Sequence, residues 1–242
     1  MNKICKLSAI ALLASSTSLM AQSKSFEGVS LGITASAIGV EVAGSSTNGG
    51  GVAGQSANKS SGSLGKAAEI AAIDLSYGFA IGNNGLIQVG ASYTPGKAKA
   101  GSGTYTDATT NSGNNNLNAG TGNLALEVKD PYTIYIAPTY VVSKDSAIYA
   151  KVGYAKADIT TTATGGASLS KKPGDLEGIS YGIGSKTMLT PNLYLGVEAN
   201  ITDYDSISAT TQANAGNGGT SSKNITADVK TVQGMITLGY KF

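Results

Sequence analysis

The chain contains no histidine and no tryptophan, and it contains no arginine among its basic residues. The absence of histidine argues against a hydrolase or an acyltransferase, because a serine without a neighbouring base is a poor nucleophile. The only cysteine, Cys5, cannot form an intramolecular disulfide or complete a Cys/His metal site. We therefore expect no catalytic residues, no cofactor-binding residues and no metal site, and we expect that the protein is not an enzyme.

Charged side chains are scarce and their signs nearly balance. They make up 13% of the residues, whereas about a quarter is usual for soluble domains. Two of the 17 lysines, Lys3 and Lys6, precede an apolar run, and the remaining lysines equal the 15 acidic residues in number. A neutral chain lacks the positive field that nucleic-acid binding requires. The sequence therefore predicts no nucleic-acid partner.

Long hydrophobic runs are also missing. The run Leu7–Leu13 follows Lys3 and Lys6 and is succeeded by a small residue at Ala21, which is the pattern of a secretory signal. It is too short to cross a bilayer as a helix, which takes about 20 residues. We predict a signal peptide at residues 1–21 and a single domain at residues 22–242, with a retained anchor as the alternative. Any membrane span after residue 21 would have to be part of a β-barrel.

What the chain does contain is alternation with a period of two. In eight segments, apolar residues occupy every second position, and small or polar residues lie between them. This pattern places the two sets on opposite faces of a β-strand. The segments are residues 26–42, 67–81, 86–97, 124–142, 147–160, 176–188, 193–205 and 230–242.

The connections between these segments alternate strictly between long and short. Four are long polar runs rich in Gly, Ser, Asn and Thr, and three are short turns. Outer-membrane barrels have this layout, with short periplasmic turns and long extracellular loops. We predict an all-β fold: an eight-stranded antiparallel up-and-down transmembrane β-barrel with four long extracellular loops. A soluble barrel with its apolar face inside would show the same alternation, but the secretory signal and the aromatics near the strand ends favour lipid.

The last segment reads KTVQGMITLGYKF and ends on an aromatic of its apolar set. It resembles the C-terminal signature of bacterial outer-membrane proteins, which is a terminal Phe with apolar residues two and four positions earlier. The resemblance implies that Leu238, Tyr240 and Phe242 form an assembly signal. It also implies that the barrel-insertion machinery is a partner during assembly.

The eight alternating segments, the stretch YTIYIAPTYVVSKDSAIYAKVGY and the ending LGYKF resemble the small OmpA/OmpX/opacity-type outer-membrane barrel family. The resemblance implies a location in the bacterial cell outer membrane and contact with outer-membrane lipids. It further implies a role in membrane integrity, adhesion or surface interaction, and sometimes a weak pore. The given chain ends at the barrel, so we do not expect the peptidoglycan-binding domain that follows the barrel in OmpA. We also expect a monomer.

Four charged residues fall on the inward face of the predicted strands: Asp74, Lys151, Lys186 and Glu198. Side chains fill a narrow eight-stranded barrel, and buried charges need partners. Lys186 and Glu198 are about one diagonal step apart on neighbouring strands, and Lys151 lies at a similar height. We predict a Lys–carboxylate cluster that, with Tyr135, Tyr149 and Tyr194, plugs the lumen. The family resemblance implies a similar network, and the alternative is a wet lumen with solvated charges.

Three functions remain open at this point. The first is a structural and surface-interaction protein, the second a small porin-like pore for ions or solutes, and the third an adhesin that acts through the loop at residues 98–123. Asp175, Glu177, Asp203 and Asp205 could hold a cation or form an acid pair, although solvated strand ends explain them more simply. The sequence identifies no ligand for the extracellular loops.

Overall fold

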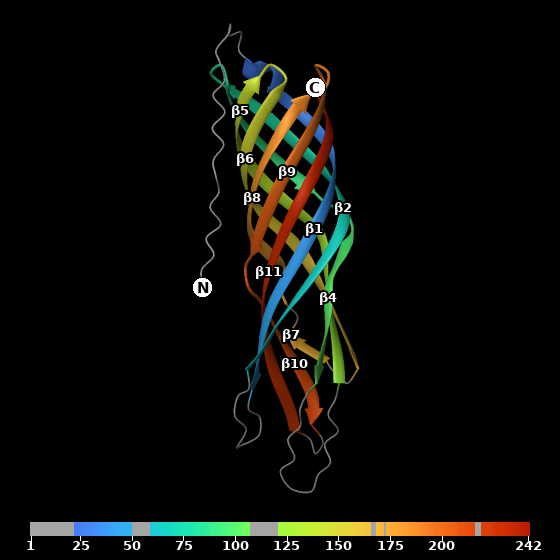
Figure 1. Ribbon diagram of the computed structural model, residues 1–242. Coiled ribbons are helices and arrows are strands. Elements are labelled where there is room, and N and C mark those ends of the chain that lie inside the picture. The colour runs from blue at the N-terminus through green and yellow to red at the C-terminus, as the bar shows by residue number, and fades with distance from the viewer. Residues whose placement is uncertain (1–21, 50–58, 107–120, 166–167, 172, 216–218) are drawn as a thin grey trace.

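The computed structural model is a long, twisted antiparallel β-structure whose upper part closes into a ring (Figure 1). It describes residues 22–49, 59–106, 121–165, 168–171, 173–215 and 219–242, so the predicted signal peptide lies outside the described residues. No helix in this part of the chain is long and apolar enough to cross a membrane. The elements are η1 (Gln22–Phe26), β1 (Gly28–Gly49), β2 (Lys59–Ile81), β3 (Gly85–Tyr93), β4 (Lys97–Thr106), β5 (Thr121–Ser143), β6 (Ser146–Gly165), β7 (Ser168–Lys171), β8 (Leu176–Met188), β9 (Leu193–Tyr204), β10 (Ile207–Ala215) and β11 (Gly219–Lys241).

Eight of these strands form the ring, in the order β1, β2, β3, β5, β6, β8, β9, β11. The ring closes because β11 pairs with β1 from Ser30 opposite Lys241 to Gly49 opposite Ser222. Every neighbouring pair in the ring is antiparallel. The predicted fold class, an eight-stranded up-and-down barrel, is confirmed.

The outer face of the ring is apolar. Ile33 is 69% exposed and Ile183 65% exposed, while the residues immediately before and after each of them are buried or half-buried. A soluble barrel would bury the apolar set and expose the polar one. The side chains therefore have the orientation of a barrel surrounded by lipid, and the soluble alternative is wrong.

Aromatic residues mark both ends of this apolar band. At the end that carries the short turns, the rings of Tyr77 and Phe79 lie 4.6 Å apart, and those of Tyr240 and Phe242 lie 5.0 Å apart. At the other end, exposed tyrosines stand on three neighbouring strands, at Tyr93, Tyr132 and Tyr154. Membrane barrels carry aromatic girdles of this kind at both interfaces.

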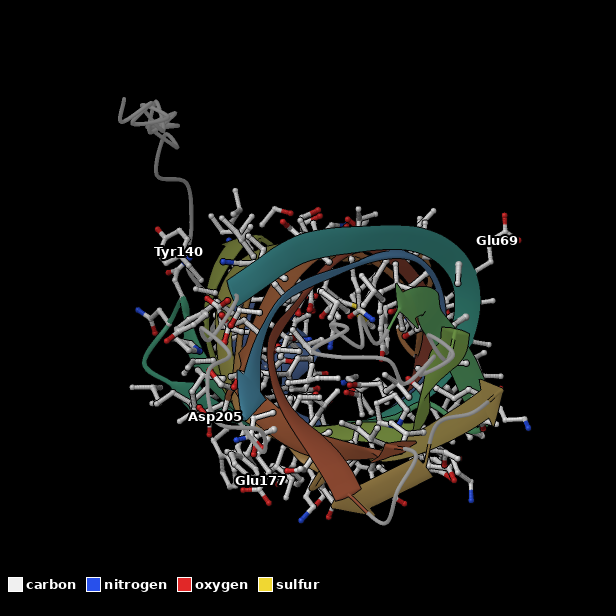
Figure 2. The ribbon with its side chains drawn as sticks, turned by 90° about the horizontal axis from the view of Figure 1, so that it is seen from below. Glu69, Tyr140, Glu177 and Asp205 are labelled. Atoms are coloured by element: carbon white, nitrogen blue, oxygen red, sulfur yellow. The ribbon has the colours of Figure 1, made fainter. Side chains whose placement is uncertain are left out.

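Beyond the second girdle the outward-facing positions become charged. Viewed along the barrel, Glu69 and Glu177 point away from the ring (Figure 2). The charged positions of this outer rim are Glu41, Glu69, Lys97, Lys129, Lys156, Asp158, Glu177, Asp203 and Lys230. The change from apolar to charged residues fixes the extracellular limit of the lipid-facing surface.

The four long connections contain more β-structure than the sequence predicts. β1 continues to Gly49, β2 begins at Lys59, and β4, β7 and β10 lie wholly or largely within runs that the sequence pattern assigns to loops. Past the rim the ring divides into two sheets, β4–β5–β6 and β2–β1–β11–β10–β7. These extensions escape detection because their sequences are rich in Gly, Ala, Ser and Thr, so no period-two alternation of apolar and polar residues marks them.

The periplasmic end of the ring is filled by η1 rather than by the start of a strand. The Ser23 amide donates to the Asn83 carbonyl at 3.0 Å, and its hydroxyl donates to the Gly82 carbonyl at 2.8 Å. Phe26 is buried in an apolar cluster with Leu86, Val141, Ala147, Met188 and Tyr194. The prediction that Phe26 opens the first strand is wrong, because its ring fills the mouth of the barrel.

Candidate functional site

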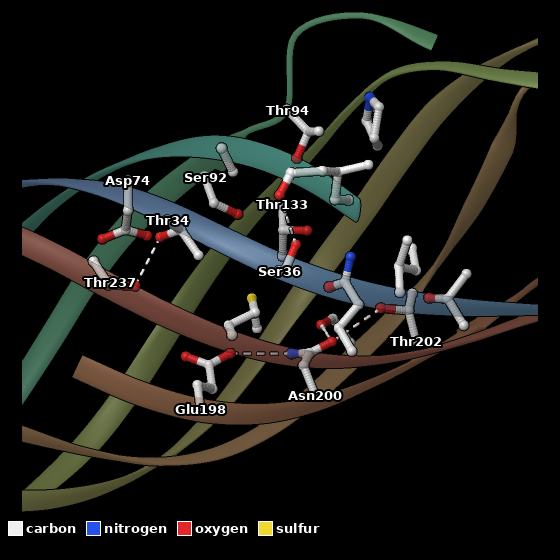
Figure 3. Close-up of a pocket in the computed structure, with 18 of the residues that line it drawn as sticks. Thr34, Ser36, Asp74, Ser92, Thr94, Thr133, Glu198, Asn200, Thr202 and Thr237 are labelled. Carbon is white, nitrogen blue, oxygen red and sulfur yellow. Dashed lines mark hydrogen bonds between the residues drawn. The ribbon is translucent and has the colours of Figure 1, made fainter. Parts of the chain in front are cut away.

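A cavity of about 380 Å³ lies inside the ring and is the candidate site. The residues that line it include all four of the predicted lumenal charges, Asp74, Lys151, Lys186 and Glu198. Hydroxyl and amide side chains from several strands surround them, among them Thr34, Ser92, Thr133, Asn200 and Thr237 (Figure 3). The site is therefore polar and is built from inward-facing positions of the strands.

One lumenal pair is fully formed. Lys151 on β6 makes an ion pair with Glu198 on β9 across the intervening β8, and the two side chains are only 8% and 9% exposed. The Tyr149 hydroxyl donates to Glu198 Oε2 at 2.9 Å, and Asn200 Nδ2 donates to Oε1 at 3.4 Å. Glu198 is thus a buried carboxylate with several donors, which is the condition under which a buried charge is tolerated.

Lys186 has different partners from those that the sequence predicts. Its Nζ donates to Gln88 Oε1 at 3.2 Å and lies 4.3 Å from the centre of the Tyr194 ring. No ion pair joins it to Glu198 among the described residues. Glu198 lies opposite Gly184 and Lys186 lies opposite Gly196, so the two are one diagonal step apart, but the carboxylate pairs with Lys151. Lys186 instead reaches across the lumen to β3.

Asp74 on β2 is held by a tyrosine and not by a lysine. The Tyr135 hydroxyl lies 2.9 Å from both carboxylate oxygens of Asp74. The Tyr135 ring also makes a cation–π contact with Lys151, whose Nζ lies 4.8 Å from the ring centre. A single hydroxyl hydrogen cannot satisfy both oxygens, so the Asp74 carboxylate retains acceptor capacity toward the cavity.

The lumenal tyrosines lie against glycines of the neighbouring strand. A Cβ added at Gly184 would come within 2.5 Å of the Tyr149 ring, and one added at Gly90 within 2.7 Å of the Tyr135 ring. The strand pattern places these tyrosines in the lumen but does not identify the glycines as the surfaces they rest on. The available signal is the presence of Gly at inward-facing positions of adjacent strands.

Apolar side chains close the periplasmic end of the polar site and form part of its wall at the outer end. At the periplasmic end the cluster around Phe26 closes the lumen. At the outer end, Val40, Ala157, Leu176 and Val229 form a second buried cluster, with Tyr204 packed against it. Sequence reasoning misses this outer cluster, because it expects inward-facing positions to be small or polar.

A kink at the rim is fixed by Asp130. Pro131 interrupts β5 and Pro95 separates β3 from β4, and Asp130 has a φ of +48°. The Gly96 amide donates to Asp130 Oδ1 at 2.9 Å, and the Tyr93 hydroxyl donates to the same oxygen at 3.3 Å. The Gly96 N–H and the nearby Lys129 hold the pKa of Asp130 below its ordinary value. The carboxylate thus replaces ladder contacts that the two prolines cannot make.

Three of the four acidic residues at the strand ends, Asp175, Glu177 and Asp203, are paired with lysines. Lys156 Nζ lies 2.9 Å from Glu177 and 3.3 Å from Asp175, and Lys230 Nζ lies 3.0 Å from Asp203. The hydrogen bond to Glu177 is the main reason why the pKa of Lys156 is raised, and the same bond lowers the pKa of Glu177. Within the described segments there is no group of three or more His, Cys, Asp or Glu side chains that could hold a metal ion.

The comparisons with known proteins agree with this architecture. Residues 9–242 match the family model of the outer membrane protein β-barrel domain. The chain belongs to this family. Membership places the protein in the bacterial outer membrane and agrees with the predicted resemblance.

One solved outer-membrane barrel shares the fold at low sequence identity, and a second is reported with it. The outer membrane protein OprG from Pseudomonas aeruginosa is 13% identical, with a TM-score of 0.56, over 89% of this chain and 97% of that chain. Ail, the attachment invasion locus protein of Yersinia pestis, is 14% identical with a TM-score of 0.37, over 86% of this chain and 99% of that chain. No curated protein matches the chain.

Proposed function

We propose that this outer-membrane barrel is a non-enzymatic, non-conducting protein whose role is membrane integrity and surface interaction. The observation that carries the proposal is that the periplasmic end of the lumen is blocked. Phe26 and its neighbours close the periplasmic mouth, and Lys186 crosses the lumen above them to reach Gln88. An ion entering from outside would have to displace both layers to reach the periplasm.

The composition of the lumen supports the same conclusion. Lys151 and Glu198 neutralise each other, and three tyrosines lie across the interior against the glycines of adjacent strands. A pore needs binding that is weak enough for ions to leave. A fixed network of bonded charges favours a stable plug instead. The absence of histidine from the chain supports the non-enzymatic part of the proposal.

The surface-interaction part of the proposal is supported by the strand extensions. β1, β2, β5, β6 and β11 run well past the charged rim and carry the chain into the extracellular space. The wall at that height is polar, so it is suited to contact with water and with other surface molecules. We also propose that the barrel is monomeric, contacts outer-membrane lipids and depends on the barrel-insertion machinery for assembly.

A small pore is the second candidate, because the lumen contains a polar cavity of about 380 Å³ whose lining extends to residues 95–97 at the outer rim. Planar-bilayer conductance of the refolded barrel distinguishes the two. We expect no steady single-channel steps from the natural chain. Steady open steps at low voltage would overturn the proposed function.

Two variants calibrate the measurement. Lys186→Ala combined with Phe26→Ala removes one side chain from each blocking layer, so we expect it to show conductance that the natural barrel lacks. Lys144→Ala, in the exposed turn between β5 and β6, is the matched control and should remain silent. Silence of the double variant, with correct folding, would mean that the tyrosines alone block the lumen.

A further inference from the structure

Among the described residues, two of the four lumenal charges make no ion pair. Lys151 and Glu198 satisfy each other. Lys186 bonds to a neutral amide and lies against an aromatic face, and Asp74 bonds to a tyrosine hydroxyl. Both of these side chains line the same cavity. A cation and an anion that do not pair with each other therefore face one enclosed space.

The remaining bonding capacity of these groups is specific. An ammonium carries three N–H donors, and Lys186 uses one of them on Gln88. The Asp74 carboxylate offers about four acceptor positions and receives one hydroxyl. Polar groups with unused capacity in an enclosed site are costly unless water or a ligand satisfies them.

The charge balance restricts which ligand fits. Asp74, Glu198, Lys151 and Lys186 together carry no net charge. A ligand with a net charge would leave that charge uncompensated inside the barrel, which is unfavourable in a partly desolvated site. A neutral molecule that carries one positive and one negative group would provide an oppositely charged partner for both Asp74 and Lys186 at once.

The size and surroundings of the cavity agree with such a molecule. Its volume of about 380 Å³ is at the small end of ligand sites in proteins. The hydroxyls of Thr34, Ser92, Thr133 and Thr237 stand with Asp74 on the cavity wall (Figure 3). The lining extends to residues 95–97, which are exposed at the outer rim, so a solute approaches from the extracellular side.

We propose that the lumen binds one small zwitterion, with its anionic group on Lys186 and its cationic group on Asp74. Binding from outside is compatible with a closed periplasmic mouth, so the site does not depend on whether the barrel conducts. The unpaired lysine and aspartate serve here as the two ends of a receptor for a dipolar solute.

Isothermal titration of the refolded barrel tests the proposal. The probes are glycine, β-alanine and 4-aminobutanoate, which carry the same two charges at increasing separation. Acetate and methylammonium carry one charge each and are the matched ligand controls. We expect one zwitterion to bind with 1:1 stoichiometry at least about tenfold more tightly than either singly charged probe, because it forms two charge-assisted contacts rather than one.

Variants assign the contacts. Asp74→Asn and Lys186→Met should each weaken zwitterion binding by about tenfold or more. Asp74→Asn/Lys186→Met keeps the lumen neutral, so it provides a foldable variant if a single change prevents folding, and it should bind no zwitterion. Asp145→Asn and Lys144→Met make the same chemical changes in an exposed turn and should leave affinity unchanged.

The proposal is overturned if no zwitterion binds at millimolar concentration. It is also overturned if acetate binds as tightly as the best zwitterion, or if the double lumenal variant retains the natural affinity. Equal loss of affinity in the exposed-turn variants would show that the binding takes place elsewhere on the barrel.

Discussion

At the scale of single residues, the buried pair Lys151–Glu198 is the part of the lumen most sensitive to change. Each side chain is about nine-tenths buried, and the Glu198 carboxylate also accepts hydrogen bonds from Tyr149 and Asn200. Removing one member leaves the other charge in the lumen without compensation. The loss of a buried partner is more damaging than the loss of an exposed one.

We predict that Glu198→Ala lowers the free energy of unfolding by about 3 kcal/mol or more. Urea titration of the barrel in lipid vesicles measures this change. The control is Asp145→Ala, which removes the carboxylate of the exposed pair Lys144–Asp145 and should cost less than about 1 kcal/mol. Equal losses in the two variants would contradict the prediction, and Glu198→Ala/Lys151→Met should recover part of the stability.

The sequence predicts which of these residues face inward but not which of them pair. The face on which a side chain lies follows from whether its position along the strand is odd or even. All four charged residues predicted to face the lumen line the cavity: Asp74, Lys151, Lys186 and Glu198. Pairing depends on the stagger between strands and on the strand tilt, and the alternation of residues along a single strand gives no information on either. For this reason the sequence places Lys151, Lys186 and Glu198 at a similar height without choosing between the two lysines, whereas in the structure Glu198 pairs with Lys151 and Lys186 bonds to Gln88.

At the scale of elements, the predictability of a strand depends on its surroundings. β8 and β9 end at Met188 and Tyr204, and the sequence pattern places those ends within one residue, because lipid on one side and a polar lumen on the other impose alternation. β4 and β10 are built mainly from Gly, Ala, Ser and Thr, so no regular alternation of apolar and polar residues marks them. η1 escapes detection because Phe26 reads as the first apolar residue of the strand that follows it.

The η1 segment makes a prediction that labelling can test. Ser23→Cys, in a Cys5→Ser background, provides a single thiol at a position that is fully buried. We expect it to react slowly with a water-soluble maleimide. Adding Phe26→Ala removes the ring that holds η1 in the apolar cluster, a type of change that costs about 3–5 kcal/mol in a packed core. Labelling should therefore be at least about tenfold faster.

A matched comparison strengthens this measurement. Phe242→Ala also removes a phenyl ring at the same end of the barrel, but that ring is 69% exposed and is not part of the cluster around Phe26. Combined with Ser23→Cys, it should leave the labelling rate of the introduced thiol unchanged. Rapid labelling without Phe26→Ala would show that η1 does not close the mouth.

At the scale of the whole molecule, the seam between β1 and β11 joins the first and last strands of the ring. The Phe242 amide donates to the Val29 carbonyl at 2.9 Å, which adds one bond to the seam. The Phe242 side chain faces outward and its ring lies against that of Tyr240. It contributes little to the folded barrel, in agreement with its proposed role as an assembly signal.

We predict that deletion of Phe242 lowers the amount of barrel in the outer membrane severalfold. The free energy of unfolding of the refolded barrel should fall by only about 1 kcal/mol, the usual contribution of one hydrogen bond. Quantitative immunoblotting of membranes and urea titration measure the two effects. Phe242→Tyr retains an aromatic end and is the control. Normal membrane levels of the shortened chain would contradict the prediction.

The division of the ring into two sheets also has a consequence for the backbone. Inside the ring every strand has two neighbours, and the last complete rungs lie at Tyr93 opposite Ile73 and Tyr132, at Ala157 opposite Leu176 and at Gly178 opposite Tyr204. Above them, within the described part of the chain, β2, β4, β6 and β7 each lack a ladder partner on one side.

Unpaired amide and carbonyl groups cannot remain in hydrocarbon, where each costs several kcal/mol. The hydrocarbon must therefore end at or below these rungs. The apolar outer surface gives way to Glu69, Lys97, Asp158 and Asp203 at the same height. The side chains and the main chain thus indicate independently the same level for the boundary between hydrocarbon and water. Every strand edge with unpaired backbone groups lies on the water side of that boundary.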